Sequence, residues 1–336
     1  MDSLTHTLLG AAIGEVILGK KIGRKAMLYG ALAGNIPDLD VLGIFFLSDS
    51  QQLLFHRGIT HSFFFAIIIS SLAGWFSGKL FINNKVSTAN WGLLFFAGIV
   101  SHLLLDSLTC YGMGWLEPFS NHRISFNTIF VADPFYTLPL LLCVSIAITA
   151  KNNSPQRIIW NKTGLWISSF YLLFTILNHE YVYYVMEKSF KEQKLFSDDF
   201  TVTPTPLNNF LWIGYSKGNE GTWIGYYSVF DKEKKVDYFR VQRNDSLLIP
   251  FENNEPVKHL KQLSKGNYII SKEDSVIYFN DLRFGQVSGW NNADAPYAFK
   301  FNLSKNADNK RALNRTKYET STWAVLASLV KRINGK

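Results

Sequence analysis

Cysteine is scarce in this sequence, which excludes two common ways of stabilising a fold. The chain has 336 residues and two cysteines. Cys110 and Cys143 lie far apart in apolar segments, so they form neither a disulfide framework nor a CxxC zinc motif. A basic segment is also missing before the first apolar stretch, which starts at Leu4. We therefore expect no cleavable signal peptide and a retained first helix.

Charge is missing from long parts of the first half. Phe63–Ser77 and Trp91–Val100 contain no charged residue and are apolar on all sides, unlike the single apolar stripe of a helix in a soluble bundle. We expect a membrane all-α bundle of about six helices over residues 1–186. The predicted helices are Leu4–Leu18, Ala26–Leu47, His61–Ile82, Trp91–Cys110, Pro134–Ala150 and Leu165–Met186.

The second half has a different composition. Short segments rich in β-branched and aromatic residues alternate with turn residues, which predicts a small β-rich C-terminal domain over residues 187–336. The predicted strands are Thr222–Phe230, Val236–Arg243, Ser246–Ile249, Tyr268–Ile270, Ser275–Asn280 and Tyr297–Asn302. A short helix is predicted at Thr322–Ile333, with one apolar side made of Trp323, Leu326, Val330 and Ile333.

Lysine and arginine are unevenly divided between the predicted connections. One side carries Lys20, Lys21, Arg24, Lys25, Lys79, Lys85, Lys151, Arg157 and Lys162. The short connections of the other side carry Arg57 and Arg123. The positive-inside rule then predicts a multi-pass protein of the bacterial cytoplasmic (inner) membrane with an extracytoplasmic C-terminal domain. The net charge of +8 comes partly from these connections, so no nucleic-acid partner is expected.

Histidine and aspartate interrupt the apolar half at positions that all fall toward the expected outer face. Burying such groups beside a bilayer costs a few kcal/mol each, about 3 kcal/mol on mild scales. A bound divalent metal would compensate for that cost. We therefore predict a site for one to three divalent ions, with zinc (Zn2+) foremost. Its predicted ligands are His6, Asp38, Asp40, His56, His61, His102 and Asp106.

Spacing supports several of these ligands. His102 and Asp106 are four residues apart and share a helix face, so they can chelate one metal or bridge two. The alternative is a buried His–Asp hydrogen bond. Asp2 and His6 repeat the spacing, although Asp2 alone could simply cap a helix.

Three residues are candidates for catalysis. Asp38 and Asp40 follow Pro37, and one of them could orient a metal-bound water; the alternative is a solvated turn at the interface. Arg57 lies between His56 and His61, where a guanidinium suits an anionic oxygen such as phosphate. Its alternative role is anchoring at the interface.

Four further residues are left open as members of the site. Asp2 and Asp133 could each cap a helix, and His122 lies in an outer loop. His179 stands beside Glu180 among tyrosines that are typical of an aromatic belt at the membrane surface.

The sequence resembles a known family at four motifs. They are Met1-Asp2-Ser3-Leu4-Thr5-His6, Gly34-Asn35-Ile36-Pro37-Asp38-Leu39-Asp40, His56-Arg57-Gly58-Ile59-Thr60-His61-Ser62 and Ser101-His102-Leu103-Leu104-Leu105-Asp106. They are similar to the YdjM family of bacterial inner-membrane proteins, called metal-dependent hydrolases. The resemblance covers residues 1 to about 150 and extends loosely to Asp281–Gly285. The ligand pattern is also loosely similar to the zinc phospholipase C and single-strand nuclease group, whose members have an HxxxD pair like His102 and Asp106.

These observations lead to three functional hypotheses. The first is a membrane-embedded, metal-dependent hydrolase that acts on a lipid-linked phosphoester at the outer leaflet through metal-activated water. The second is a zinc lipid amidase similar to the alkaline ceramidases. The third is a non-catalytic metal-binding membrane protein or a transporter. A transporter would need ligands staggered across the membrane, whereas these are expected on one face.

Overall fold

The chain forms two compact units. The computed structural model describes residues 1–81, 86–152, 154–195, 199–218, 221–303 and 322–335. One unit combines residues 1–42 with 55–176, and the other combines 43–54 with 177–336. The predicted boundary at residue 186 lies inside one long helix. All predicted metal ligands belong to the first unit.

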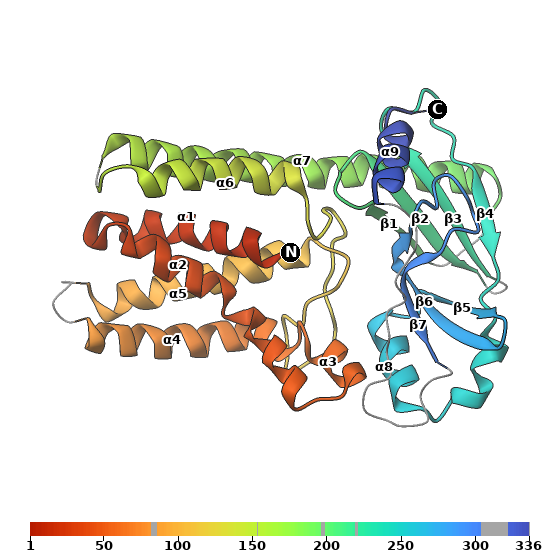
Figure 1. Cartoon of the computed structure of the whole chain (residues 1–336), viewed down its shortest axis with the longest axis horizontal. Helices are drawn as coiled ribbons and strands as arrows, with labels where there is room; N and C mark the ends of the chain where they lie inside the picture. Colours follow the sequence, from red (N-terminus) through yellow and green to blue (C-terminus); the bar gives the residue numbers. More distant parts are fainter. Residues whose placement is uncertain (82–85, 153, 196–198, 219–220, 304–321, 336) are drawn as a thin grey trace. The chain divides into compact units, whose positions relative to one another are not determined.

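The first unit is built from helices that lie side by side (Figure 1). α1 packs against α2, α5 and α6, and α4 packs against α5. The helices are α1 Ser3–Ile22, α2 Lys25–Asn35, α4 Phe63–Leu80, α5 Thr88–Ser107, α6 Pro134–Thr149 and the first part of α7 Pro155–Glu192. Shorter segments connect α2 to α4: η1 Pro37–Phe45, α3 Asp49–Phe55 and η2 Ile59–His61.

Each predicted membrane segment contains a helix, but a bundle of six spans is not confirmed. Within the described residues, α4 and α5 are the two helices long and apolar enough to cross a membrane by length and composition, and α6 is a shorter apolar helix. The predicted segment Ala26–Leu47 is not one continuous α-helix, because its sequence is interrupted at Asn35-Ile36-Pro37-Asp38. α2 ends at Asn35, because Pro37 cannot continue the α-helical hydrogen bonds, and η1 follows as a 3-10 helix. Ile82 and Lys85 lie outside the described residues.

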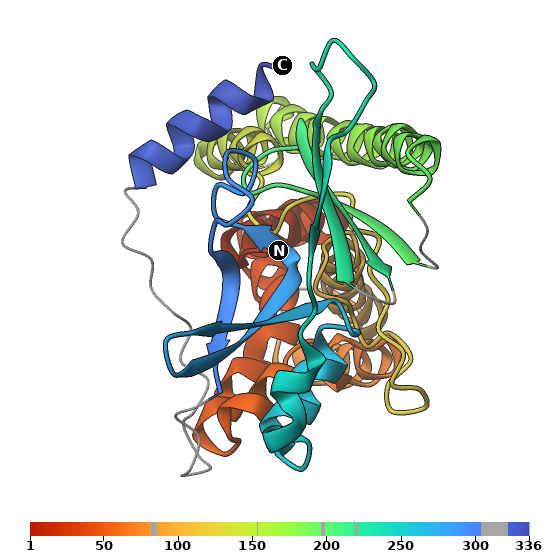
Figure 2. The same ribbon diagram turned by 90° about the vertical axis from the view of Figure 1, so that its right-hand side faces the viewer.

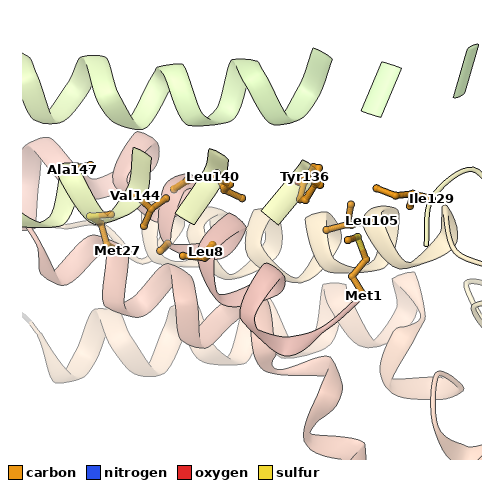
Figure 3. Close-up of a cluster of buried hydrophobic side chains, with 11 residues drawn as sticks. Met1, Leu8, Met27, Leu105, Ile129, Tyr136, Leu140, Val144 and Ala147 are labelled. Carbon is orange, nitrogen blue, oxygen red and sulfur yellow. The ribbon is translucent and has the colours of Figure 1, made fainter. Parts of the chain in front are cut away.

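A buried apolar cluster runs along the helices of the bundle, from Met1 and Ile129 to Met27 and Ala147 (Figure 3). It joins Leu8 of α1, Leu105 of α5 and Leu140 of α6. α1 and α2 approach through glycines: a Cβ on Gly34 would lie 2.6 Å from the carbonyl oxygen of His6. Small residues permit such a close helix contact, and here the contact fixes α2 beside His6.

The second unit contains two antiparallel sheets (Figure 2). The four-stranded sheet has the order β1-β2-β3-β4, and Trp212 of β2 lies opposite Tyr227 of β3. The three-stranded sheet has the order β5-β6-β7, and Ile270 lies opposite Phe279. The elements are β1 Asp199–Pro204, β2 Leu211–Gly218, β3 Gly221–Ser228, β4 Tyr238–Val241, η4 Asp245–Phe251, α8 Glu255–Leu263, β5 Tyr268–Glu273, β6 Val276–Gln286, β7 Tyr297–Asn302 and α9 Thr322–Ile333.

One prediction for this unit is wrong and another is confirmed. Ser246–Ile249 lies in the 3-10 helix η4 and not in a strand. The helix predicted at Thr322–Ile333 is confirmed as α9. Leu329 and Arg332 are buried, and Arg332 pairs with Asp231 at 2.7 Å, while Trp323 is 81% exposed. The ion pair with Arg332 therefore sets the orientation of α9.

Candidate metal centre

One end of the helical unit collects every ligand predicted from the sequence. His6 comes from the first turns of α1, and His102 and Asp106 come from the end of α5. Asp38 and Asp40 lie in η1, which exists because Pro37 ends the α-helical run. His61 closes η2, just before Ser62 caps α4 by accepting a hydrogen bond from the Phe65 N–H. We call the set of His6, Asp38, Asp40, His56, His61, His102 and Asp106 the metal centre.

Two histidines in this set face each other with unshared electron pairs. The carbonyl oxygen of Gly34 lies 2.7 Å from His102 Nδ1, so Nδ1 carries the proton and Nε2 is free. Thr60 donates its hydroxyl proton to Asp40 and therefore accepts from His61 Nδ1 at 3.0 Å. Both Nε2 atoms are then lone-pair donors, and they lie 3.1 Å apart. Such a contact is repulsive unless a cation sits beside it.

This spacing fits a metal. Two ligand atoms held tetrahedrally by zinc at roughly 2.1 Å lie about 3.4 Å from each other. Burial lowers the pKa of His61 to about 4 despite the nearby Asp38 and Asp40, so its ring is neutral at neutral pH, as a ligand must be.

Asp106 and His6 extend the centre on its buried side. His6 Nε2 lies 3.0 Å from Asp106 Oδ1, which also contacts the Met1 ammonium group. The His6 ring stacks on His102 with centroids 3.6 Å apart. Asp106 Oδ2 is buried and makes no hydrogen bond in the described part of the chain; Arg57 Nη2 lies 3.5 Å away and His102 Nε2 lies 3.7 Å away. A buried carboxylate oxygen without a hydrogen bond is costly, and a further cation beside it would lower that cost.

Asp40 and Asp38 form the other side. Asp40 receives the backbone N–H of Arg57 at 3.0 Å and lies 2.9 Å from His56 Nδ1. Burial alone would raise the pKa of Asp40, but these hydrogen bonds outweigh it and lower the pKa. Burial would likewise raise the pKa of Asp38, yet the neighbouring His61 and His102, whose Nε2 atoms lie 3.5 Å and 3.6 Å from Asp38 Oδ1, hold it well below its usual range. Both carboxylates are ionised at neutral pH and can accept a cation or a proton.

The ligand atoms overlap in three groups, in each of which they lie within 4.8 Å of one another. The groups are His6 with Asp38 and His102, His61 with His102 and Asp106, and Asp38 with Asp40 and His56. The side chains of His56 and Asp38 are 37% and 21% exposed, whereas the other ligands are buried. The centre is therefore closed on the His6 side and open on the side of Asp38 and His56.

Arg57 lies at the same place in an unusual backbone conformation. Its φ of 65° falls in the left-handed region, which non-glycine residues seldom adopt. Its guanidinium lies over the Tyr111 ring at 4.0 Å and 3.5 Å from Asp106 Oδ2. The Nε–H is buried, and no residue that the structure describes accepts it. Arg57 thus has a charge-bearing donor beside the ligands that is still free to bind an anion.

The four residues whose membership of the site the sequence did not decide lie away from the metal centre or have structural roles. Asp2 caps α1 by accepting from the Thr5 N–H at 3.0 Å, and Asp133 caps α6 and accepts from the Tyr171 hydroxyl at 2.8 Å. His122 is an exposed loop residue, and His179 lies 3.1 Å from Glu180 in α7. None of the four belongs to the ligand groups found among the described residues.

Sequence reasoning missed the groups that orient the ligands. The Gly34 carbonyl and the Thr60 hydroxyl set the two histidine tautomers, and Tyr111 supports Arg57. Thr60 stands next to His61, which is the one signal that could have identified it. Gly34 and Tyr111 act through tertiary contacts that spacing along the chain does not reveal.

Comparison with known proteins places this end of the chain in a family. A family model described as YdjM inner membrane protein matches residues 1–182, just over half of the chain and short of Asp281–Gly285. The inner membrane protein YbcI of Escherichia coli (strain K12) is 31% identical over 122 residues, which cover 36% of this chain and 69% of that protein. No solved structure matches. The protein, with its His and Asp residues gathered at one end of an apolar helical unit, therefore belongs to the YdjM family of inner membrane proteins.

Proposed function

We propose that the protein is a membrane-embedded, metal-dependent hydrolase that acts on a lipid-linked phosphoester at the outer leaflet. The observation that carries this proposal is the pair of unprotonated Nε2 atoms of His61 and His102, 3.1 Å apart. Asp106 Oδ2 lies 3.7 Å from His102 Nε2 and makes no hydrogen bond within the described residues, so three acceptor atoms converge at this place.

The ligand residues divide into a buried part and an open part. His6, His61, His102 and Asp106 would hold an ion in the interior, and Asp38 with Asp40 and His56 would hold one at the open side. When bound, a divalent ion, with zinc foremost, supplies Lewis acidity toward water and toward a phosphoryl oxygen.

The chain's own groups supply the rest of the chemistry. Asp38 is ionised and partly exposed, so it can orient an attacking water by accepting a hydrogen bond from it. Arg57 lies 3.5 Å from Asp106 Oδ2 and keeps a free Nε–H, so it can hold an anionic oxygen close to the ligands. Arg57 N–H and Thr60 fix Asp40, which keeps the open side rigid.

Hydrolysis in a defined membrane tests the proposal. The purified chain, reconstituted in lipid nanodiscs, is assayed with long-chain phosphatidic acid and with an N-acyl sphingosine. We expect phosphate release that a chelator abolishes and added zinc restores. His179→Ala is a matched control, because it removes a histidine outside the metal centre. Amide cleavage alone would support the amidase hypothesis, and cleavage of neither class by metal-loaded protein would contradict both.

Arg57→Lys separates substrate binding from metal binding. An ammonium group cannot reproduce the planar fork of a guanidinium or its stacking on Tyr111. We expect unchanged metal content and a loss of turnover by roughly 100-fold, of the order found when one oxyanion donor is removed. Metal content is read by mass spectrometry of the purified variant. Full turnover in Arg57→Lys would instead indicate that Arg57 anchors the protein at the interface.

The proposed orientation puts the metal centre and the C-terminus outside the cytoplasm. It depends on the Lys and Arg distribution between the connections. A C-terminal alkaline phosphatase fusion should be active, and a C-terminal green fluorescent protein fusion should be dark. The reverse pattern would contradict the orientation and with it the outer-leaflet substrate.

A further inference from the structure

The segment that carries two metal ligands is apolar on its outside. Leu39, Val41 and Leu42 of η1 are 58%, 56% and 53% exposed. Asp40, between them, is buried and points to the metal centre. Residues 36–47 contain Asp38 and Asp40 as their charged residues, and both are engaged in the centre. The outward side of η1 around the ligands is therefore free of charge.

A second apolar segment lies on the other side of the His56–Ser62 motif. Leu116 is 51% exposed and Phe119 is 79% exposed. The Gly114 N–H donates to the Arg57 carbonyl at 3.0 Å, while the Arg57 N–H donates to Asp40. Arg57 thus joins the two segments through its backbone. We call Leu39, Val41, Leu42, Leu116 and Phe119 the apolar rim.

The apolar rim continues into the outer surface of α4. The Phe119 ring packs edge-on against Phe64 at 5.6 Å, and the Phe63 N–H donates to the Trp115 carbonyl at 3.1 Å. α4 is one of the helices suited to cross a membrane, and its exposed large apolar side chains are Phe64, Ile67, Ile68, Leu72, Trp75, Phe76 and Leu80. A lipid-facing helix surface and the rim are therefore one continuous apolar surface.

Exposed aromatic and aliphatic clusters of this kind mark a membrane or partner contact. Because the apolar rim continues into the surface of α4, the membrane is the better of these two explanations. Glu117 is the charged residue within 111–119, and it lies 3.7 Å from Arg123, so its charge is partly neutralised. Phenylalanine and leucine on short segments beside a membrane helix are suited to insert at the boundary between headgroups and acyl chains.

We propose that the apolar rim is inserted in the outer leaflet and that an acyl-chain substrate reaches the metal centre laterally from the bilayer, between η1 and the 114–119 segment. The substrate class is a membrane-resident amphiphile whose headgroup meets Asp38 and His56, the exposed ligands. This route rests on the proposed hydrolase function, but insertion of the rim does not, and the two are tested separately.

Insertion is measured by spin labels. Leu42→Cys and Phe119→Cys are each labelled in a background in which the buried Cys110 and Cys143 are replaced by alanine. Asn121→Cys, an exposed polar position in the same loop, is the control. In nanodiscs, labels at positions 42 and 119 should show a several-fold higher ratio of collision with oxygen to collision with a water-soluble nickel chelate. Equal ratios at all three positions would overturn the proposal.

The lateral route is measured by substrate preference. Leu42→Asn/Phe119→Asn should lower kcat/KM for long-chain phosphatidic acid in vesicles by about tenfold, since each inserted side chain contributes apolar binding. Turnover of the water-soluble p-nitrophenyl phosphate and the metal content should not change. Equal effects on both substrates, or no effect on either, would overturn the lateral route. If the unaltered protein hydrolyses neither substrate, the proposed function fails, while the spin labels still decide whether the rim is inserted.

Discussion

Two buried clusters of charged residues in the helical unit differ in how many of their polar atoms have hydrogen-bond partners. One is the metal centre. The other is an ion pair between Glu15 of α1 and Arg157 of α7, about 14 Å further along α1 than His6. Arg157 donates from Nε to Glu15 Oε1 at 2.8 Å, from Nη2 to Glu15 Oε2, and from Nη1 to Asn152 at 2.5 Å. Every polar group of the guanidinium has a partner.

In the metal centre, by contrast, several polar atoms lack a hydrogen-bond partner. Two histidine lone pairs face each other, Asp106 Oδ2 has no donor, and the Arg57 Nε–H has no acceptor among the described residues. A buried ion pair with all of its hydrogen bonds made is a structural element that closes a helix contact. Met1 and Arg57 bring positive charge to Asp106, yet Asp106 Oδ2 and the two histidine Nε2 atoms still lack donors, so an added cation would stabilise the cluster. The comparison thus distinguishes the Glu15–Arg157 ion pair, whose charges join two helices, from the metal centre, whose polar groups are available to a ligand.

Removing a shared ligand should break the buried part of the metal centre. His102 belongs to two of the three ligand groups, so His102→Ala is expected to abolish metal binding there and to leave only the group of Asp38, Asp40 and His56. Asp106→Ala should lose most of the metal as well. Metal per protein is measured by mass spectrometry after purification in detergent. Full occupancy in both variants would show that the pair is a simple buried hydrogen bond and not a ligand set.

Removing one member of the Glu15–Arg157 pair should destabilise the fold and leave the metal in place. Glu15→Ala leaves an uncompensated buried charge on Arg157, which costs about 3–5 kcal/mol of unfolding free energy. The double variant Glu15→Met/Arg157→Met should recover most of that loss, because it removes both charges. Denaturant unfolding in micelles measures the stability, and the folded fraction is analysed for metal. Loss of metal in Glu15→Ala would contradict the separation of the two clusters.

The sequence predicts which residues gather at one end of the helical unit better than it predicts their setting. The four-residue spacing of His102 and Asp106 suffices to place both on one helix face, because the helix period is a local property. Arg157, in contrast, is predicted as a cytoplasmic connection residue and is in fact fully buried against Glu15. Its partner lies 142 positions away, and no local pattern joins them.

The same limit applies to the strands. β1 and β2 are not predicted, because β1 ends in a proline-containing stretch, Pro204 and Pro206, that reads as a loop, and β2 contains Gly214. The two segments are strands because they pair with each other, with Thr201 opposite Tyr215. Tertiary pairing overrides weak local propensity in such strands.

The smallest expected effect concerns the hydroxyl that sets the tautomer of His61. Thr60 lies 3.0 Å from His61 Nδ1 and donates to Asp40 Oδ2 at 3.1 Å, so it connects both sides of the metal centre. Thr60→Val keeps the shape and removes the hydroxyl. We expect metal affinity to fall by roughly 10-fold, the lower end of the effect of losing a residue that orients a ligand. Competition with a fluorescent zinc chelator measures the change.

Thr60→Ser is the matched control, because it keeps the hydroxyl and loses a methyl group. If serine preserves affinity and valine lowers it, the free Nε2 of His61 depends on the hydrogen bond at its other nitrogen. Equal affinities for valine and the unaltered protein would mean that His61 adopts its tautomer without Thr60. The Gly34 carbonyl would still assign the tautomer of His102, but no hydrogen bond would assign that of His61. The conclusion that two lone pairs face each other in the metal centre, unlike the fully paired groups of Glu15 and Arg157, would then be weaker.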